Sequence, residues 1–307
     1  MLGFGDYNYE HFSPEMFHEL EHARFSGPLA GESAPDFKGK TLNGDKVRLS
    51  DYRGRKNVLL VFGSVTCPMT AASITALNEL YDLVGGNEIE FLFIYVREAH
   101  PGEKIPAHDS VSDKTAAAKL LREEEDIEMP ILVDDLSGSI HRKYSRLPNP
   151  AFLIDRSGCV AFRSMWANPE ELAAAIEELL EAQHKRGVDH VIARDGEGLS
   201  MPVSYAMLSS FRALERGGRE AVSDFREAIG GVETGPEGGA FSESLLEHPG
   251  RVLAVTALTT AVLAGGLYAG FELRKRRLGV RRNPYRAYEK DEVRDAETGE
   301  DYGAVGI

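Results

Sequence analysis

Two runs of strand-forming residues, each followed by a helical pattern, constrain the fold of this chain more than any other feature. The first run, NVLLVFG at 57–63, precedes TAASITALNELYDLV, in which apolar residues recur at helical spacing. The second, EIEFLFIYV at 88–96, precedes the helical pattern DKTAAAKLLREEE. Strands separated by helices are typical of parallel strands joined by right-handed crossovers. The pattern therefore predicts an α/β domain built on a parallel sheet.

Further patterns continue this alternation along the chain. MPILVD at 129–134 predicts a short strand, and PAFLIDRSGCVAFRSMW at 150–166 predicts two strands around an Asp-Arg-Ser-Gly turn. NPEELAAAIEELLEAQHK predicts a helix with Asn168 as its cap and Pro169 at its first position. An earlier hairpin is indicated by the Asn-Gly pair in KTLNGDKVRL. The final hairpin adds an antiparallel edge to the sheet.

The chain is acidic and poor in cysteine. Its 49 acidic and 35 basic residues give a net charge of −14, which argues against a general nucleic-acid binder. Cys67 and Cys159 are too few for a disulfide framework, so the fold must depend on an apolar core. We expect no metal and no cofactor, because metal-ligand spacing is lacking at the histidines His108, His141, His184 and His190.

One apolar stretch near the carboxyl end predicts a membrane span. Val252–Phe271 carries no charge, and about 20 helical residues cross a hydrocarbon core of roughly 30 Å. The strongly basic run RKRRLGVRR follows it. We therefore expect a single-pass transmembrane helix at 251–273 that tethers the protein to a membrane. The alternative is a buried helix of a soluble domain.

The side of the membrane on which the α/β domain lies stays open. The basic run predicts a cytoplasmic tail, which would put the preceding domain outside. The amino-terminal residues, however, have neither the basic region nor the long apolar region of a signal peptide. These two indications point to opposite sides.

Cys67 follows a predicted buried strand and precedes a predicted helix. A thiol at a helix amino terminus faces unpaired backbone N–H groups and the positive end of the helix dipole, and both favour the thiolate. We therefore expect its pKa to lie below the free value of about 8.5. The alternative is that Cys67 is a small buried hydrophobic residue.

The residues around Cys67 resemble a known superfamily. The stretch SAPDFKGKTLNGDKVRLSDYRGRKNVLLVFGSVTCP is similar to redoxins and peroxiredoxins, and it resembles iodothyronine deiodinases and their bacterial relatives more closely. Those proteins carry a G-S-x-T-(Cys or selenocysteine)-P segment, here 63–68, and an E-A-H-P segment after the next strand, here 98–101. The resemblance covers roughly residues 33–182 and implies a thioredoxin-like fold.

The resemblance and the predicted sheet together give a set of candidate site residues. Because the carboxyl ends of parallel strands meet at one edge of a sheet, we expect Cys67 and His100 to lie close together. Cys67 is expected to be the nucleophile, with Thr66 stabilising its thiolate. His100 is the expected acid/base, and Glu98 its orienting partner.

Three further residues are expected to contribute to substrate binding: Ser64, Pro68 and Pro150. Thioredoxin-fold proteins keep a cis-proline before a late strand, near the reactive cysteine. We expect Pro150 to take this place, with Pro148 as the alternative.

The chain departs from the resembling families at several positions. Ser64 stands where peroxiredoxins have threonine, and Asn149 falls where they have an arginine, so that Arg146 is the substitute considered. Thr70 occupies the position of the second cysteine of a Cys-x-x-Cys motif. Cys159 is expected to be a buried strand residue at the far end of a hairpin, about 15 Å from Cys67 at roughly 3.3 Å per residue, which is too far for a disulfide.

The resulting functional hypothesis is a membrane-tethered, single-cysteine thiol oxidoreductase. It would reduce a peroxide or a disulfide through Cys67 and be regenerated by an external thiol. The first alternative is a deiodinase-like reductive dehalogenase acting on a halogenated small molecule, although an iodinated hormone is not implied. The second is a redox-inactive thioredoxin-fold module that binds partners at the membrane.

The predicted organisation of the chain has six parts. They are a helical lead-in at 1–32, the thioredoxin-like domain at 33–183, a helical extension at 184–230, a linker at 231–250, the transmembrane helix at 251–273, and a basic then polar tail at 274–307.

Overall fold

The computed structural model describes residues 7–16, 25–86, 88–187, 195–196 and 212–230. Its centre is a five-stranded sheet in the order β5-β4-β3-β6-β7. The strands are β3 (Asn57–Gly63), β4 (Ile89–Tyr95), β5 (Ile131–Val133), β6 (Ala151–Ile154) and β7 (Val160–Ser164). Strand β3 pairs in parallel with β4, and β4 in parallel with β5. Strands β6 and β7 complete the sheet as an antiparallel edge, which confirms the α/β prediction.

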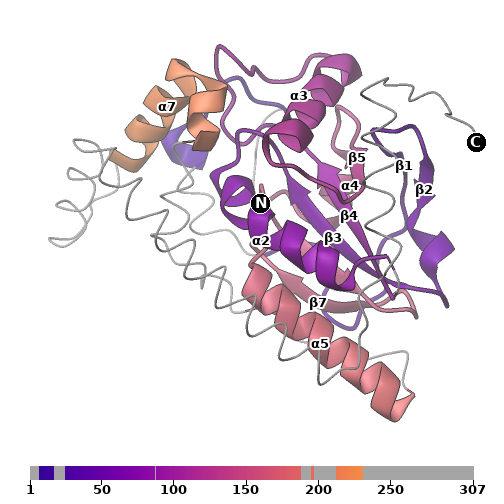
Figure 1. Ribbon diagram of the computed structural model, residues 1–307. Coiled ribbons are helices and arrows are strands. Elements are labelled where there is room, and N and C mark those ends of the chain that lie inside the picture. The colour runs from indigo at the N-terminus through magenta and orange to yellow at the C-terminus, as the bar shows by residue number, and fades with distance from the viewer. Residues whose placement is uncertain (1–6, 17–24, 87, 188–194, 197–211, 231–307) are drawn as a thin grey trace, which may run out of the picture.

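Helices cover both faces of the sheet (Figure 1). One face packs against α2 (Pro68–Val84), α3 (Val111–Glu124) and α5 (Pro169–Arg186). The other packs against the 3-10 turn η1 (Leu49–Tyr52) and α4 (Ser139–Tyr144). Residues of β3 are buried on both sides, as the fully apolar run predicts. A separate hairpin joins β1 (Lys38–Lys40) to β2 (Lys46–Arg48).

The helix boundaries follow from local sequence. Asn168 caps α5 by accepting a hydrogen bond from the Glu170 N–H at 3.0 Å, and Pro169 occupies the first helical position. Gly187 ends α5 in the left-handed conformation that glycine adopts readily. Ser110 caps α3 through the Asp113 N–H at 3.1 Å. Each of these helix boundaries is therefore determined by residues at the helix end itself.

The described residues outside the predicted 33–183 domain include an amino-terminal segment and a later helical segment. Residues 7–16 contain a helical turn at 14–16. Residues 212–217 are helical and lead into α7 (Arg219–Gly230). In Figure 1 the amino-terminal segment, in indigo, lies beside α7, in orange.

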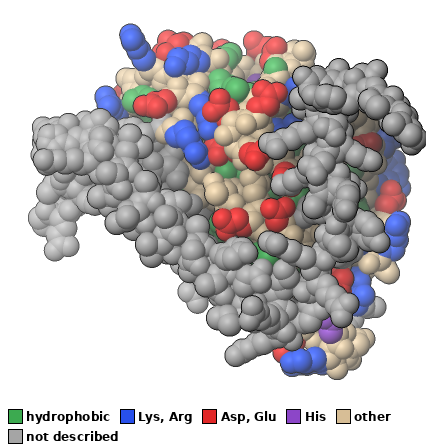
Figure 2. Space-filling view, viewed as in Figure 1, with side chains coloured by type: hydrophobic (Ala, Val, Ile, Leu, Met, Phe, Trp, Pro, Cys, Tyr) green, Lys and Arg blue, Asp and Glu red, His purple; other side chains and the backbone are tan. Residues whose placement is uncertain are grey.

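The described residues include no helix with the length and apolar character needed to cross a membrane. The predicted linker at 231–250, span at 251–273 and tail at 274–307 lie outside the described residues. On the face seen in Figure 2, acidic and basic side chains are interspersed among the described residues.

Two expectations about the late hairpin are wrong. The peptide bonds before Pro148 and Pro150 are trans, because no described residue has a cis bond. Pro150 precedes β6 in extended backbone, where its carbonyl accepts a hydrogen bond from the Phe62 N–H at 3.0 Å. Cys159 is half-buried and lies before β7 in an isolated bridge to Ser33, because the pairing of β6 with β7 is irregular at this end and begins at Val160.

Candidate active site

Cys67 lies at the amino terminus of α2, where β3 turns into the helix. It is the N-cap residue with extended backbone angles, and Pro68 occupies the first helical position. The Cys67 N–H donates to the Ser64 carbonyl at 3.2 Å, which closes the turn. The predicted strand–turn–helix context of this cysteine is therefore confirmed.

The Cys67 thiol is buried, with a relative exposure of 1%. Burial raises its pKa, since the thiolate loses hydration. Hydrogen bonds from the hydroxyl and N–H of Thr70 and from the Met69 N–H act in the opposite direction, and the negative charge of Glu98 raises the pKa further. The expectation of a lowered pKa is thus wrong, because burial outweighs the helix terminus.

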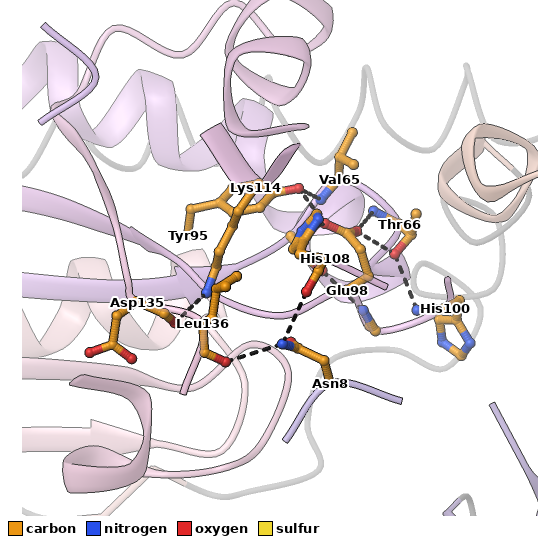
Figure 3. Close-up of polar contacts among 12 residues, drawn as sticks. Asn8, Val65, Thr66, Tyr95, Glu98, His100, His108, Lys114, Asp135 and Leu136 are labelled. Atoms are coloured by element: carbon orange, nitrogen blue, oxygen red, sulfur yellow. Dashed lines mark hydrogen bonds and ion pairs between the residues drawn. The ribbon is translucent and has the colours of Figure 1, made fainter. Parts of the chain in front are cut away.

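Glu98 is the centre of a buried hydrogen-bond network beside Cys67 (Figure 3). One carboxylate oxygen accepts from the N–H and hydroxyl of Thr66, at 3.0 and 2.6 Å. The other accepts from the Tyr95 hydroxyl at 2.5 Å and from Nε2 of His108 at 2.9 Å. Four donors therefore converge on one carboxylate from β4, the β3–α2 turn and the loop before α3.

These contacts keep Glu98 ionised. Burial by itself raises the pKa of a carboxyl group. The hydrogen bond and positive charge of His108, followed by the hydrogen bonds of Thr66 and Tyr95, outweigh burial and leave the pKa of Glu98 below its usual value. The site therefore holds a buried anion paired with a histidine.

His100 does not form the predicted pair with Glu98. Its ring lies between Phe12 and Phe225, with centroid separations of 4.3 and 5.3 Å. Its Nδ1 has no hydrogen-bond partner among the described residues, and burial lowers the pKa of the imidazole to about 3. Figure 3 shows the His100 ring turned away from Glu98, whereas His108 points toward it. Packing between Phe12 and Phe225 holds the ring in this orientation. Both residues lie outside the predicted 33–183 domain, so the resemblance did not indicate this contact.

Thr66 and Ser64 have structural partners in this arrangement. The Thr66 hydroxyl donates to Glu98 and accepts from the His100 N–H at 3.1 Å, so that its proton is directed to Glu98. The Ser64 hydroxyl accepts from the Ala99 N–H at 3.2 Å. Both side chains therefore join the turn before Cys67 to the segment after β4. These two segments lie at the same edge of the sheet, as predicted.

Asn149 occupies the place where an arginine was expected by resemblance. Its Nδ2 donates to the Phe62 carbonyl at 2.8 Å and lies 3.5 Å from the Thr70 hydroxyl. Its Oδ1 accepts from the Ala167 N–H at 3.2 Å. The Asn149 side chain therefore links the start of β6 to Thr70, the residue whose hydroxyl contacts the thiol. Arg146 lies instead on a small cavity of about 20 Å³ that His100 also lines.

Sequence reasoning missed four residues of the site: Tyr95, Arg97, His108 and Thr70. Tyr95 ends an apolar strand, and a buried phenol needs a hydrogen-bond partner. A tyrosine at this place was therefore the one sequence feature that could have indicated a polar site. Arg97 is buried, donates to the Tyr7 carbonyl at 2.6 Å, and lies over the rings of Tyr7 and Tyr9 at 5.1 and 5.0 Å. Nothing local in the sequence marks His108 above the other histidines.

The residues that the structure describes contain no group of three or more histidine, cysteine, aspartate or glutamate side chains arranged to bind a metal ion. Cys67 and Cys159 are both free thiols. They lie toward opposite ends of β3, because Val61 pairs with Ala151 whereas Val58 pairs with Ile154, beyond which the turn to Cys159 begins.

A thioredoxin-like sheet with one cysteine at the start of the helix after its central strand defines a redoxin-type domain. The AhpC/TSA family model matches residues 30–163. The type I iodothyronine deiodinase of Xenopus laevis is 31% identical over 176 residues, which cover 53% of this chain and 67% of that protein. This chain belongs to the deiodinase-like group of redoxin-like proteins.

Other similarities are more partial. The thyroxine 5-deiodinase of Gallus gallus is 31% identical over 39% of this chain, and the match spans half of that protein. A peroxiredoxin of Thermotoga maritima is 25% identical over 58% of this chain and 78% of its own length. Among solved structures, an exposed lipoprotein thioredoxin of Streptococcus pneumoniae has 24% identity and a TM-score of 0.36, over 47% of this chain and 100% of that chain.

Proposed function

We propose that this protein is a thiol-dependent oxidoreductase that reduces a peroxide or a disulfide through Cys67. The observation that carries this proposal is the position of Cys67 at the amino terminus of α2, directly after Thr66, whose N–H and hydroxyl both donate to the buried Glu98 carboxylate. A nucleophilic thiol next to a buried, charge-paired acid/base group is an arrangement suited to such chemistry.

With a peroxide, the thiolate sulfur attacks one oxygen and the O–O bond breaks. Cys67 becomes a sulfenic acid, and the departing oxygen takes up a proton to leave as an alcohol or water. An external thiol then forms a mixed disulfide with Cys67 and releases water. A second external thiol breaks that disulfide and restores the Cys67 thiol, with the reductant leaving as its own disulfide.

We propose that the hydrogen-bond network around Glu98 carries out the proton transfers. Glu98 and His108 form a buried pair, with side-chain exposures of 1% and 3%, and Thr66 links it to the residue that reacts. His108 is therefore the histidine that we propose as the acid/base group in place of His100. Thr70 is proposed to hold the sulfur through its hydroxyl. Substrate contacts by Ser64, Pro68 and Pro150 remain proposals.

The external thiol follows from the position of Cys159. Cys159 lies beyond the end of β6 that is remote from Cys67, and it is not placed to resolve an oxidised Cys67. The reductant would therefore be a separate small thiol or a dithiol protein.

Reductive dehalogenation is the second candidate, and the similarity to proteins named as deiodinases favours it. In that reaction Cys67 would take the halogen from an aryl carbon, which receives a proton in exchange, and a sulfenyl halide would form. Two external thiols would then release halide and regenerate the Cys67 thiol. The match to half of the Gallus gallus protein leaves the substrate of the present chain a proposal.

A redox-inactive binding module is the third candidate. The burial of Cys67 and its raised pKa favour this alternative, since a neutral thiol is a weak nucleophile. We also propose tethering to a membrane through residues 251–273, of which 252–271 carry no charge, with the side open. Tags at each end, tested for protease access in intact cells, would determine the side.

Turnover assays separate the three candidates. The full chain is given dithiothreitol together with an organic hydroperoxide, a disulfide or an aryl iodide. Consumption of peroxide, reduction of the disulfide above the rate without protein, and release of iodide are measured. We expect peroxide or disulfide turnover that disappears in Cys67→Ser and persists in Cys159→Ser. Iodide release alone would favour the dehalogenase, and the absence of all three activities would contradict an enzymatic function.

A further inference from the structure

Two segments that are remote in sequence from Cys67 lie over its site. They are residues 7–16 and 212–230, which flank the redoxin domain on both sides in the sequence. His11 of the first pairs with Asp224 of the second at 3.0 Å, so that they form one layer. We call residues 212–230 the cover.

The cover contacts the turn that carries Cys67. Arg216 donates to the Val65 carbonyl at 3.4 Å and forms an ion pair with Glu125 at 2.5 Å, and both of these side chains are buried. Arg212 donates to the Ala71 carbonyl, in the first turn of α2, at 3.0 Å. These contacts attach the cover to the amino-terminal end of α2, where the thiol lies.

Gly217 brings the cover into direct contact with the site. A β-carbon at this position would lie 2.7 Å from the His100 carbonyl oxygen and 3.5 Å from the Thr66 methyl group. Phe225 of α7 meets the His100 ring edge-on, while Phe12 packs on the same ring from the amino-terminal segment. The two segments thus enclose His100.

The enclosed arrangement is unfavourable for chemistry. In this arrangement the Cys67 thiol has almost no solvent contact, and Nδ1 of His100 has no hydrogen-bond partner among the described residues. A buried polar atom without a hydrogen bond costs free energy. The small cavity beside His100, of about 20 Å³, admits little more than a water molecule. A substrate of ordinary size does not fit this cavity, and the thiol itself is almost unexposed.

The outer attachment of the cover is exposed. Glu103, in the loop after β4, accepts from the N–H groups of Arg219 and Glu220 at 2.6 and 2.8 Å and so caps α7. The Lys104 N–H donates to the Gly217 carbonyl at 3.0 Å. Solvent competes for exposed contacts of this kind, so they can be broken without disturbing the sheet.

From these contacts we infer that residues 212–230 are an autoinhibitory cover, and that the structure is a closed resting state in which Cys67 is withheld from bulky substrates. The cover must move away from the β3–α2 turn for such a substrate to reach the thiol. This inference rests on the proposed function only for its biological meaning, because the accessibility of Cys67 can be measured without any turnover.

The test measures labelling of Cys67 in the full chain with Cys159→Ser as background. The probe is a maleimide carrying a polyethylene glycol chain, which adds a large mass and is followed by gel shift. Gly217→Val places a side chain against the His100 carbonyl and against Ala221 of the cover itself, and so disrupts the docking of the cover. We expect the labelling rate to rise by about tenfold or more, as overpacking of this size displaces one segment from another.

A matched control and a second variant complete the test. Ser223→Val adds the same side chain at an exposed position of α7 and is expected to leave the rate unchanged. Glu103→Ala removes the cap of α7 from outside the site and is expected to raise the rate about fivefold. If circular dichroism shows that Gly217→Val unfolds the chain, the labelling rate of Glu103→Ala tests the inference in its place.

Equal labelling rates in the Cys159→Ser parent and the folded opening variants would overturn the inference. Raised labelling with no turnover of any substrate would instead support the cover and contradict the proposed function.

Discussion

Glu98 is the residue on which the polar contacts of the site converge, and it is the first place to test the site. Replacing it by glutamine puts an amide NH₂ where a carboxylate oxygen now accepts hydrogen bonds. We expect Glu98→Gln to lower the free energy of unfolding by about 1–3 kcal/mol, because buried donors lose their partner. Turnover is expected to fall about 100-fold, the usual size of an acid/base contribution.

The control for this prediction is Glu90→Gln, on β4, the strand that precedes Glu98. Glu90 pairs with Lys56 at 2.8 Å in a partly exposed position, where an ion pair contributes little. Urea denaturation and turnover of both variants would be compared. A Glu98→Gln variant with the activity of Glu90→Gln would show that the buried carboxylate has no role in the reaction.

The sequence allowed most of the site residues to be named, but it did not show which residues they contact. The sequence marks Cys67, Glu98 and His100 because each follows a recognisable strand, and the turn around Cys67 is determined locally. The partners of Glu98 and His100 are set by contacts across the fold. Phe225 lies 125 positions after His100. Burial of Cys67 within the folded chain raises the pKa of its thiol, against the direction expected from its place at a helix terminus.

Among the elements, β3 and α5 are joined by a buried reciprocal amide pair. Asn57 and Gln183 each donate one hydrogen bond to the other, both at 2.9 Å. We expect Asn57→Ala to lower the free energy of unfolding by about 1–3 kcal/mol, because the Gln183 amide loses both hydrogen bonds that Asn57 provides. The measurement is urea denaturation of the full chain.

The double variant Asn57→Leu with Gln183→Leu serves as its control. Replacing both partners by apolar groups is expected to recover most of the lost stability. A single variant as stable as the parent would contradict a structural role for this pair.

The strands and long helices were predictable because their signals are local: apolar runs for β3 and β4, and a cap with proline for α5. The short helix α4 was not, because its six residues carry no clear period. Its position depends on Asp134, whose carboxylate accepts from the N–H groups of Ile140 and His141 at 3.0 and 2.9 Å.

At the scale of the whole molecule, stability depends on two buried histidines. Burial lowers the pKa of both His100 and His141 to about 3. His141 donates from Nε2 to the Leu147 carbonyl at 2.7 Å, and its Nδ1 accepts from the Tyr7 hydroxyl at 2.9 Å, so the ring is neutral. In the unfolded chain both groups titrate near pH 6.5.

Unfolding therefore takes up protons below about pH 6.5, where only the unfolded chain binds them. The stabilisation is complete above this pH and is lost as the pH falls toward 3. We expect each histidine to contribute a slope of up to about 1.4 kcal/mol per pH unit between pH 6 and 4. Urea denaturation at several pH values measures the slope.

His100→Phe keeps an aromatic ring between Phe12 and Phe225 and is expected to reduce the slope. His184→Gln, at an exposed position on α5, is its control and is expected to leave the slope unchanged. An unchanged slope in His100→Phe would contradict the buried neutral state of His100.

The layer formed by residues 7–16 and 212–230 could not be foreseen from the sequence. Helical character after residue 184 was predicted, but its docking on the redoxin domain depends on single contacts such as Arg216 with Glu125 and Gly217 with His100. Neither segment contains a pattern that names its partner surface.

The central claim is that Cys67 is a redox-active nucleophile, and trapping its oxidised form tests this claim most directly. The full chain with Cys159→Ser would receive one equivalent of hydrogen peroxide, a molecule small enough for the enclosed site, and then dimedone, which reacts with sulfenic acids. Mass spectrometry of the intact and digested protein locates the adduct. We expect one dimedone adduct, on Cys67, which does not form in Cys67→Ser or when dithiothreitol is added before dimedone. An unmodified Cys67 thiol, in a folded chain with Gly217→Val as well as in the parent, would contradict it.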